Sequence, residues 1–303
     1  MKLAALGFAV LLAAGSAFAD DLDTAFQNLK QAEAQKDNAK LKEAAVATYA
    51  LANKVIATPA PAAADDKPAW DAAVANAKGV QAYVEYALLT ASGTAAPASA
   101  ADLLTTLAQL NPKSTYLEQN YGFYLEAMRK SGAPAAQIQT AAENGVAAFP
   151  ANEDLLLWLA DAAYTHKQAD RCVAYSKRLI ASLNTRAKPE NLSAADWERK
   201  RTAALGHGYF LAGSSLNEQH QYLDADKMLR LALPLAAGND ALRAQVLYLL
   251  GVANYQLGTM TNNKAMVLEA VKFSKQAADI PGPMQQNAKR NAYAMDQQSY
   301  KMH

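Results

Sequence analysis

The sequence predicts an all-α protein built from antiparallel helix pairs. Alternating Val, Ile and Thr runs do not occur, and no Asn-Gly or Asp-Gly pair separates two strand-like runs, so strands are not indicated. Apolar residues instead recur with helical period along most of the chain, between short breaks of Gly, Pro and Asn. The segments come in pairs that end at a proline, as at Pro112, Pro150 and Pro281. We expect twelve or thirteen helices from these breaks.

Residues 1–19 have the layout of a secretory signal peptide. Lys2 precedes an unbroken apolar run, and Ala17 and Ala19 form the A-x-A pattern that signal peptidase cuts, here before Asp20. The run is shorter than the roughly 20 residues that a spanning helix needs, which disfavours an uncleaved anchor. No Cys stands at the cleavage position, which argues against lipoprotein attachment. We therefore expect a periplasmic or secreted protein with no integral membrane span after cleavage.

The composition limits the classes of partner. The 303 residues are 51% hydrophobic and 19% charged, which favours a globular core over disorder. The chain has 29 Lys and Arg and 28 Asp and Glu, and the two numbers become equal when Lys2 is removed with the signal peptide. A balanced chain without a basic block gives no electrostatic reason to expect nucleic acid as a partner. The single cysteine, Cys172, cannot form an internal disulfide.

The helical segments divide the chain into regions. Residues 20–60 are predicted to form an N-terminal helical pair, followed by a loop with the sequence TPAPAAADDKP. Residues 69–150 hold further pairs, and residues 151–281 hold three pairs with a clearer repeat. A segment near 184–204 interrupts that repeat, and residues 282–303 are expected to form a capping helix.

The repeat becomes visible when residues 210–234 are written above residues 248–258 and their continuation 267–281. Small residues then share columns, since Gly213 aligns with Gly251, Ala225 with Ala270 and Ala232 with Ala277. Residues 155–179 fit the same frame, with Ala160 in the glycine column and Cys172 in the first alanine column. Further upstream, Gly122 takes the glycine column.

This pattern resembles the tetratricopeptide repeat (TPR). The family carries Leu-Gly and an aromatic residue on helix A, two small residues on helix B, and a closing proline. The resemblance is strong over about 150–281 and degenerate over 69–150, and it implies a right-handed α-solenoid of antiparallel helix pairs. The last pair departs from the pattern, because the residues TMTNNKA are expected to lengthen its inter-helix turn.

Gly251 interrupts an apolar helical run in an alanine-rich chain, although Gly costs about 1 kcal/mol relative to Ala inside a helix. We expect it at a close helix crossing, facing Ala270 and Ala277, where a Cβ would push the helices apart. Gly258 is expected in the following turn, where substitution by Ala would be milder than substitution of Gly251 by Leu. Cys172 is interpreted as a small buried hydrophobe, and the alternative is a reactive thiol.

The candidate binding surface is the concave face that the TPR resemblance implies for the A helices. It is aromatic and neutral-polar without Lys or Arg, so the carboxylate clamp of chaperone-tail TPR proteins is absent. Such a face can take peptide side chains, and the alternative is that its aromatic residues pack within the fold. Its members are Tyr116, Gln119, Phe123, Asp154, Leu157, Asp161, Tyr164, His207, Phe210, Ser214, Asn217, Gln245, Tyr248 and Tyr255.

Catalytic and metal patterns are nearly absent. None of the four histidines lies three or four residues from another His or from Cys172, so a metal site is not predicted. A nucleophile elbow and a phosphate-binding loop are also missing, so we expect no cofactor. The carboxylates that could reach the concave face are Glu126, Asp154 and Asp161.

These observations favour a non-catalytic scaffold that binds a protein or peptide partner in the cell envelope. One alternative is a helical enzyme that acts on envelope glycan, which would need a paired acid and base in one cleft. The other is a structural subunit of an envelope complex that uses its convex face.

Overall fold

A computed structural model describes residues 20–189 and 192–302. This part of the chain is helical with no strand, so the predicted fold class is confirmed at that level. The predicted signal peptide, including Ala19, lies outside the described residues, and Asp20 is the first described residue, in a helix that is described over residues 20–34. None of the described helices is both long and apolar enough to cross a membrane.

The chain divides into two compact units, Met1–Phe149 and Pro150–His303, called unit 1 and unit 2 here. Unit 1 contains helix 20–34, α2 (Asn38–Ala57), α3 (Lys67–Thr94), α4 (Pro97–Leu110), α5 (Thr115–Lys130) and α6 (Ala135–Ala148). Unit 2 contains α7 (Glu153–Thr165), α8 (Ala169–Thr185), α9 (Ala194–Glu218), α10 (Tyr222–Leu235), α11 (Asp240–Met260), α12 (Lys264–Ala278) and α13 (Gln285–Ser299). The predicted loop after residue 57 contains one short 3-10 turn, Ala64–Asp66.

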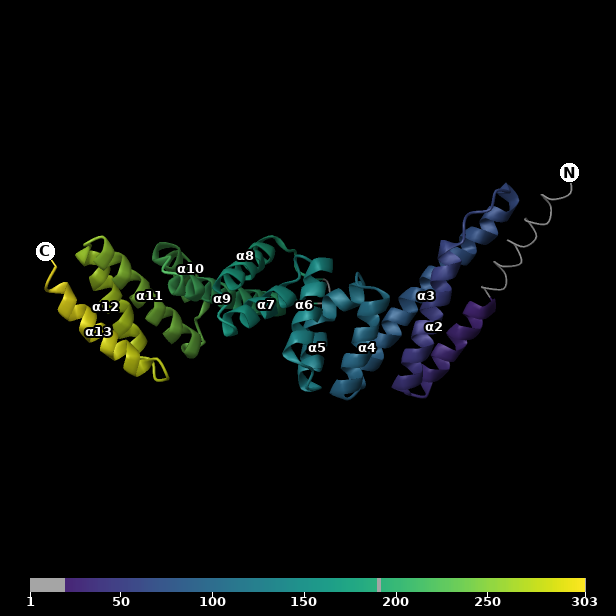
Figure 1. The fold of residues 1–303 in the computed structure, drawn as a ribbon, viewed down its shortest axis with the longest axis horizontal. Helices are drawn as coiled ribbons and strands as arrows, with labels where there is room; N and C mark the ends of the chain where they lie inside the picture. Colours follow the sequence, from purple (N-terminus) through teal and green to yellow (C-terminus); the bar gives the residue numbers. More distant parts are fainter. Residues whose placement is uncertain (1–19, 190–191, 303) are drawn as a thin grey trace. The chain divides into compact units, whose positions relative to one another are not determined.

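Within unit 2 each helix packs against the next one in sequence, and Figure 1 shows α7 to α13 following one another in that order. The odd-numbered helices also contact one another, since α7 touches α9, α9 touches α11 and α11 touches α13. Unit 1 has the same neighbour packing from α2 to α6, with added contacts between α2 and α4 and between α3 and α5. Adjacent helices therefore pack in pairs in both units.

Five helix pairs are joined by the same turn. In each, the residue two positions after the helix has a positive φ and donates its N–H to the carbonyl three residues back. The next N–H donates to the carbonyl five residues back, which completes the Schellman motif of helix C-termini. The left-handed residues are Lys36, Gly132, Lys167, His220 and Asn262. Only one of the five is glycine, so the sequence did not display this repeat.

The last hairpin corrects a prediction about its turn. The turn between α11 and α12 has the standard length, and the extra residues lengthen the two helices instead. Met260 ends α11 nine residues after Gly251, whereas Glu218 ends α9 five residues after Gly213. Ala270 stands six residues into α12 and Ala225 three into α10. Each helix thus gains about one turn of 3.6 residues, which keeps the packed faces in phase.

The small-residue columns of the repeat correspond to equivalent close contacts. A Cβ built on Gly213 would lie 3.3 Å from the Ala225 carbonyl oxygen, and a Cβ on Gly251 would lie 3.3 Å from that of Ala270. Gly251 therefore does sit at a close crossing, although its nearest neighbour is Ser274, whose Oγ would be 2.5 Å from the Cβ, and not Ala277.

Gly258 had been expected in the connection between the two helices. It lies instead within α11, in the last helical turn. A Cβ there would lie 2.9 Å from the backbone nitrogen of Val267 and 3.0 Å from the carbonyl oxygen of Asn263. The lengthened helices thus approach each other closely a second time.

The segment near 184–204 is an extension of two helices joined by a connection. It covers the end of α8, the connection to α9 and the first turns of α9. Trp197 is buried there at 4% exposure, and the Lys200 ammonium lies 2.9 Å from the buried Glu153 carboxylate and 3.0 Å from Asp154. Burial opposes protonation of Lys200, but the Asp154 and Glu153 carboxylates outweigh it and raise its pKa. The segment is therefore anchored to α7.

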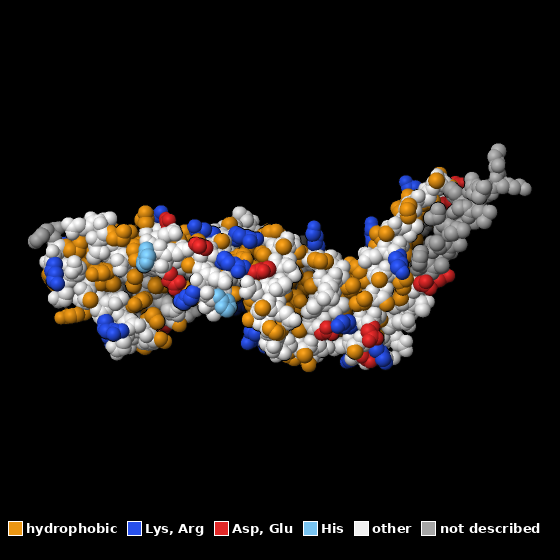
Figure 2. All heavy atoms as spheres, viewed as in Figure 1, with side chains coloured by type: hydrophobic (Ala, Val, Ile, Leu, Met, Phe, Trp, Pro, Cys, Tyr) orange, Lys and Arg blue, Asp and Glu red, His pale blue; other side chains and the backbone are white. Residues whose placement is uncertain are grey.

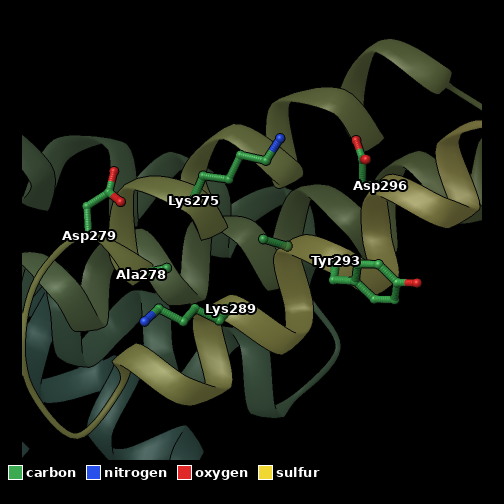
Figure 3. Close-up of a pocket in the computed structure, with 7 residues that line it drawn as sticks. Lys275, Ala278, Asp279, Lys289, Tyr293 and Asp296 are labelled. Atoms are coloured by element: carbon green, nitrogen blue, oxygen red, sulfur yellow. The ribbon is translucent and has the colours of Figure 1, made fainter.

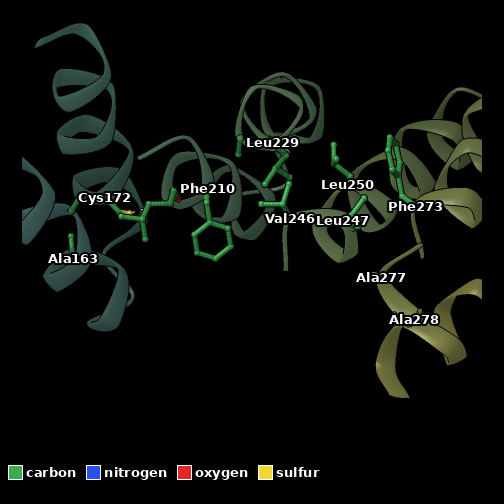
Figure 4. Packing of buried hydrophobic residues seen from close by; sticks show 14 residues of the cluster. Ala163, Cys172, Phe210, Leu229, Val246, Leu247, Leu250, Phe273, Ala277 and Ala278 are labelled. Carbon is green, nitrogen blue, oxygen red and sulfur yellow. Dashed lines mark hydrogen bonds between the residues drawn. The ribbon is translucent and has the colours of Figure 1, made fainter. Parts of the chain in front are cut away.

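A continuous apolar core runs through unit 2 from α7 and α8 to α12 and α13 (Figure 4). Cys172 belongs to this core, is fully buried and directs its thiol toward the Leu211 carbonyl at 3.8 Å. Burial raises the pKa of the Cys172 thiol, the opposite of what a reactive thiolate needs. These observations favour the small-hydrophobe interpretation. Repeat positions Ala160, Ala225, Ala232, Ala270 and Ala277 are fully buried as well.

Candidate functional site

A cleft of about 380 Å³ opens in unit 2 across three successive odd-numbered helices. Helix α7 supplies one lining residue, α9 and α11 supply most of the others, and one more comes from the connection between α12 and α13. The lining residues are Tyr164, Phe210, Ser214, Asn217, Glu218, Gln245, Tyr248, Leu249, Val252 and Met284. Six of them, Tyr164, Phe210, Ser214, Asn217, Gln245 and Tyr248, belong to the concave face predicted from the sequence.

Helical spacing explains why these side chains converge. Phe210, Ser214 and Asn217 stand four and three residues apart on α9, which places them on one face. Gln245, Tyr248 and Val252 repeat the pattern on α11. Because α9 contacts both α7 and α11, the stripes of the three helices lie next to one another.

One wall of the cleft is an aromatic and hydroxyl cluster. The Tyr164 hydroxyl lies 3.1 Å from the Ser214 hydroxyl, and the Tyr164 and Phe210 rings meet edge to face with centroids 6.1 Å apart. Beside them, the centroids of the His207 and Phe210 rings are 6.2 Å apart, and the His207 Nε2 lies 2.7 Å from an Asp161 carboxylate oxygen. The rings in this wall are therefore held by neighbours from α7 and α9 before any ligand binds.

Asn217 stands at the α9–α11 side of the cleft and is 7% exposed. Its side-chain N–H₂ donates to the Leu249 carbonyl at 3.1 Å, which ties α9 to α11. Its Oδ1 has no hydrogen-bond partner within the described residues. This oxygen is also buried from solvent, so it is an unsatisfied acceptor inside the α9–α11 contact and not a group at the cleft surface.

Glu218 carries the one charge among the lining residues. Its Oε1 lies 3.2 Å from the Lys167 ammonium, and that ammonium is 5.8 Å from the centroid of the Tyr164 ring. Lys167 and Glu218 side chains are 73% and 40% exposed, so the pair is solvent-accessible. The rim of the cleft thus holds a cation between a carboxylate and an aromatic ring.

Several predicted residues lie elsewhere. Tyr255 is on α11 but packs against Ala270, Val271 and Met295, because α11 extends beyond α9 and is covered there by α12 and α13. Asp154 is bound to Lys200, away from the lining residues. Leu157 packs on the core cluster of unit 2.

Phe210 has two environments. It lines the cleft, but it is only 5% exposed and belongs to the core cluster. The alternative that the aromatic residues pack within the fold therefore applies to Phe210 and Tyr255. Tyr164 and Tyr248 are partly buried, and they pack against the same core cluster while lining the cleft.

Tyr116, Gln119 and Phe123 lie on α5 in unit 1, where Gln119 and Phe123 are exposed. Tyr116 ends a row of aromatic contacts that the sequence analysis missed. The distances between ring centroids along this row are 5.2 Å from Phe26 to Tyr83, 6.1 Å from Tyr83 to Tyr86, and 6.3 Å from Tyr86 to Tyr116. Tyr83 and Tyr86, three residues apart on α3, were the available signal for it.

The carboxylates considered for catalysis are each held by a different partner. Glu126 is bound by Arg129, whose hydrogen bonds lower the pKa of this exposed carboxyl to about 2. Asp154 is bound by Lys200 and Asp161 by His207. None of the three lines the cleft.

A second hollow of about 340 Å³ lies between α12 and α13. Figure 3 shows Lys275 and Asp279 on one side and Lys289, Tyr293 and Asp296 on the other. All but Asp296 are exposed, with Tyr293 at 71%. The hollow is therefore a shallow depression with mixed charge.

The described residues contain no group of three or more His, Cys, Asp or Glu side chains placed to hold a metal ion. On the face shown in Figure 2, acidic and basic side chains are interspersed over hydrophobic and neutral surface in both units. No protein-family model and no curated protein matches the chain.

Proposed function

We propose that this chain is a non-catalytic interaction scaffold, a TPR-like α-solenoid of the cell envelope that binds an extended peptide segment of a partner protein. The peptide lies in the cleft of unit 2 and follows the row of side chains from α7 through α9 to α11. The observation that carries the proposal is the convergence of those three helices on one cleft, lined by residues that the repeat pattern places on its A helices.

The chemistry of the cleft suits a peptide. Tyr164 and Tyr248 offer half-buried aromatic surface that can pack against side chains, and aromatic anchors often supply most of the binding energy of an interface. Ser214 and Gln245 offer neutral hydrogen-bonding groups of the kind that pair with peptide amides. The tie of Asn217 to Leu249 and the packing of Tyr164 on Phe210 reduce the ordering cost of binding.

The repeat architecture is supported by the equivalent crossings of Gly213 and Gly251 and by the five matching Schellman turns. Stacked helix pairs of this kind expose a continuous groove along their A helices. The envelope location rests on the signal-peptide pattern of residues 1–19.

The test is selection of binders from a random-peptide phage library on the immobilised chain, followed by binding measurements with the selected peptides. We expect Tyr248→Ala to weaken binding roughly thirtyfold or more, since truncation of an interface anchor costs about 2 kcal/mol. The matched control is Leu231→Ala, which truncates a 48% exposed side chain on α10 outside the cleft and should leave binding unchanged. If the Tyr248→Ala variant still melts cooperatively and binds the selected peptides as tightly as the wild type does, the cleft is not the binding site.

A structural role that uses the even-numbered helices is the second candidate. It is favoured by exposed leucines on α10 and α12, namely Leu223 at 57%, Leu231 at 48% and Leu268 at 48%. If this surface is the functional one, Leu231→Ala and Leu268→Ala should abolish co-purification from envelope extract while Tyr248→Ala leaves it intact. The two candidates therefore predict opposite results for the same variants.

A further inference from the structure

We infer that the peptide bound by the cleft carries a Lys or Arg side chain beside an apolar one, and that the basic side chain takes the place of Lys167 between Tyr164 and Glu218. This inference rests on the proposed function of the cleft and specifies the chemistry of its ligand. It is argued from the charge of the lining, the hydrogen-bonding groups and the position of Lys167.

The lining selects a cationic ligand over an anionic one. No lining residue is Lys or Arg, and Glu218 carries the one formal charge. Helix α9 has no Lys, Arg, Asp or Glu from residue 202 to residue 217, and α11 has none from residue 244 to residue 260. A second carboxylate, Asp161, lies next to this wall in its pair with His207. A ligand carboxylate would meet these like charges, and the Lys167 ammonium at the rim is already paired with Glu218.

The free hydrogen-bonding capacity also favours a donor-rich ligand. Within the described residues, the Glu218 carboxylate at the rim accepts a bond only from the exposed Lys167. A carboxylate is an acceptor, so a ligand that binds it must bring N–H donors. Ammonium and guanidinium groups bring donors and charge together.

Lys167 shows where such a cation fits. Its ammonium is 3.2 Å from Glu218 and 5.8 Å from the Tyr164 ring centroid, so it occupies a carboxylate and aromatic site of the kind that binds cations. The side chain is 73% exposed, and an ion pair this open to water is weak enough to be exchanged. A ligand cation that arrives with an apolar neighbour gains contact as well with Leu249 and Val252, which line the same cleft.

The backbone at Lys167 provides a clean variant. Its φ of 58° lies in the left-handed region, which glycine adopts without strain. Lys167→Gly therefore removes the resident cation and keeps the Schellman turn. Glu218→Gln removes the carboxylate with little change of shape, and Asp224→Asn on α10 is its matched control away from the cleft.

The experiment measures binding of short degenerate peptides whose central pair is Phe-Arg, Phe-Gln or Phe-Glu. We expect the Phe-Arg pool to bind the wild-type chain about tenfold more tightly than the Phe-Glu pool, as for one charge-assisted hydrogen bond. Glu218→Gln should bring the pools within about twofold of each other, Lys167→Gly should widen the difference, and Asp224→Asn should leave it unchanged.

The outcomes separate the ligand chemistry from the cleft itself. Equal or tighter binding of the Phe-Glu pool, or an unchanged ranking in Glu218→Gln, would overturn the cationic ligand while leaving the cleft function standing. If Glu218→Gln lowers the melting temperature without moving the ranking, the Lys167–Glu218 pair is a structural contact and the inference fails. Binding by none of the pools, or binding that Tyr248→Ala leaves intact, would overturn both proposals.

Discussion

The two units form the same helix pairs with different side chains at the crossings. In unit 2, Gly213, Gly251 and Gly258 stand where a Cβ would meet the facing helix, and Ala225 and Ala270 face two of them. In unit 1, the glycines of α3, Gly79 and Gly93, have open space around them. Counted back from the shared turn, Leu29 and Leu125 take the position of Gly213, and the predicted Gly122 stands three residues before Leu125.

The Schellman turn that joins two helices and the close crossing between them are independent features of the fold. The same Schellman turn closes hairpins in both units, because it needs only backbone groups and one left-handed residue. The small residues decide how closely two helices approach, and they are concentrated at the α9–α10 and α11–α12 crossings, beside the cleft. The predictions that follow test this difference, starting with the largest expected effect.

Substitution of Gly251 by Leu should cost about 3 kcal/mol of unfolding free energy or more. The added side chain has to enter a crossing where even a Cβ meets Ser274 and the Ala270 carbonyl, and overpacking of this kind is strongly destabilising. Urea unfolding followed by circular dichroism measures the loss. The control is Gly79→Ala on α3, where an added Cβ would have no neighbouring atom within 4 Å. The higher helix propensity of Ala should raise the unfolding free energy of this variant by about 0.5–1 kcal/mol. Similar losses in both variants would contradict the difference between the units.

Gly258→Ala should be more destabilising than Gly251→Ala, although the turn position expected for Gly258 from the sequence predicted a mild effect. The Cβ at position 258 meets backbone atoms of Val267 and Asn263, which can give way only if the helices move, and we expect a loss of about 1–2 kcal/mol. At position 251 the closest atom is the Ser274 hydroxyl, which can rotate, and the propensity gain of Ala of about 1 kcal/mol offsets the strain. Thermal melts of the two variants decide the order.

Tyr121→Phe should reduce the alkaline sensitivity of unit 1. The tyrosines buried in the described residues, Tyr49, Tyr121 and Tyr124, all lie in this unit, and burial raises the pKa of Tyr121 to about 12. The unfolded pKa is about 10, so the neutral phenol contributes fully below pH 10 and loses its contribution as pH rises toward 12.

Phenylalanine does not ionise, so the unfolding free energy of Tyr121→Phe relative to wild type should rise by up to about 2 kcal/mol across that interval. Parallel urea titrations at neutral and alkaline pH measure the difference. A constant difference between the two proteins at all pH values would show that Tyr121 does not titrate with folding.

The shared turns should respond in the same way in both units, with the smallest effects. His220→Gly relieves a non-glycine residue at φ 61° and should stabilise by about 0.5–1 kcal/mol, because the left-handed region penalises a Cβ. Asn262→Gly should raise the unfolding free energy by only a few tenths of a kcal/mol, since Asn tolerates the left-handed region better than His does. Gly132→Ala in unit 1 should cost about 1 kcal/mol. Thermal melts of the three variants check the order, and a loss in His220→Gly would contradict it.

The candidate cleft was partly foreseeable. Tyr164, Phe210, Asn217, Gln245 and Tyr248 could be placed together because helical spacing and the repeat column fix the face on which each stands. Val252 shares that face and takes the repeat column of Ser214, so its sequence signal was present and missed. Leu249 follows Tyr248 directly, and Met284 comes from a connection with no periodicity, so neither was indicated. Tyr255 shares the face of Tyr248, and only the position of α12 and α13 shows that it is covered.

The sequence by itself determined the helical class, the pairing of helices and the columns of small residues, because hydrophobic period, helix breaks and side-chain size are local properties that a single chain displays. Tertiary structure alone decided that seven extra residues lengthen two helices instead of a turn, that Gly258 lies at a second crossing, and that Lys167 and Glu218 meet at the rim of the cleft. Each of these depends on how one helix is set against another, and that distance and phase are fixed by packing between segments far apart in sequence.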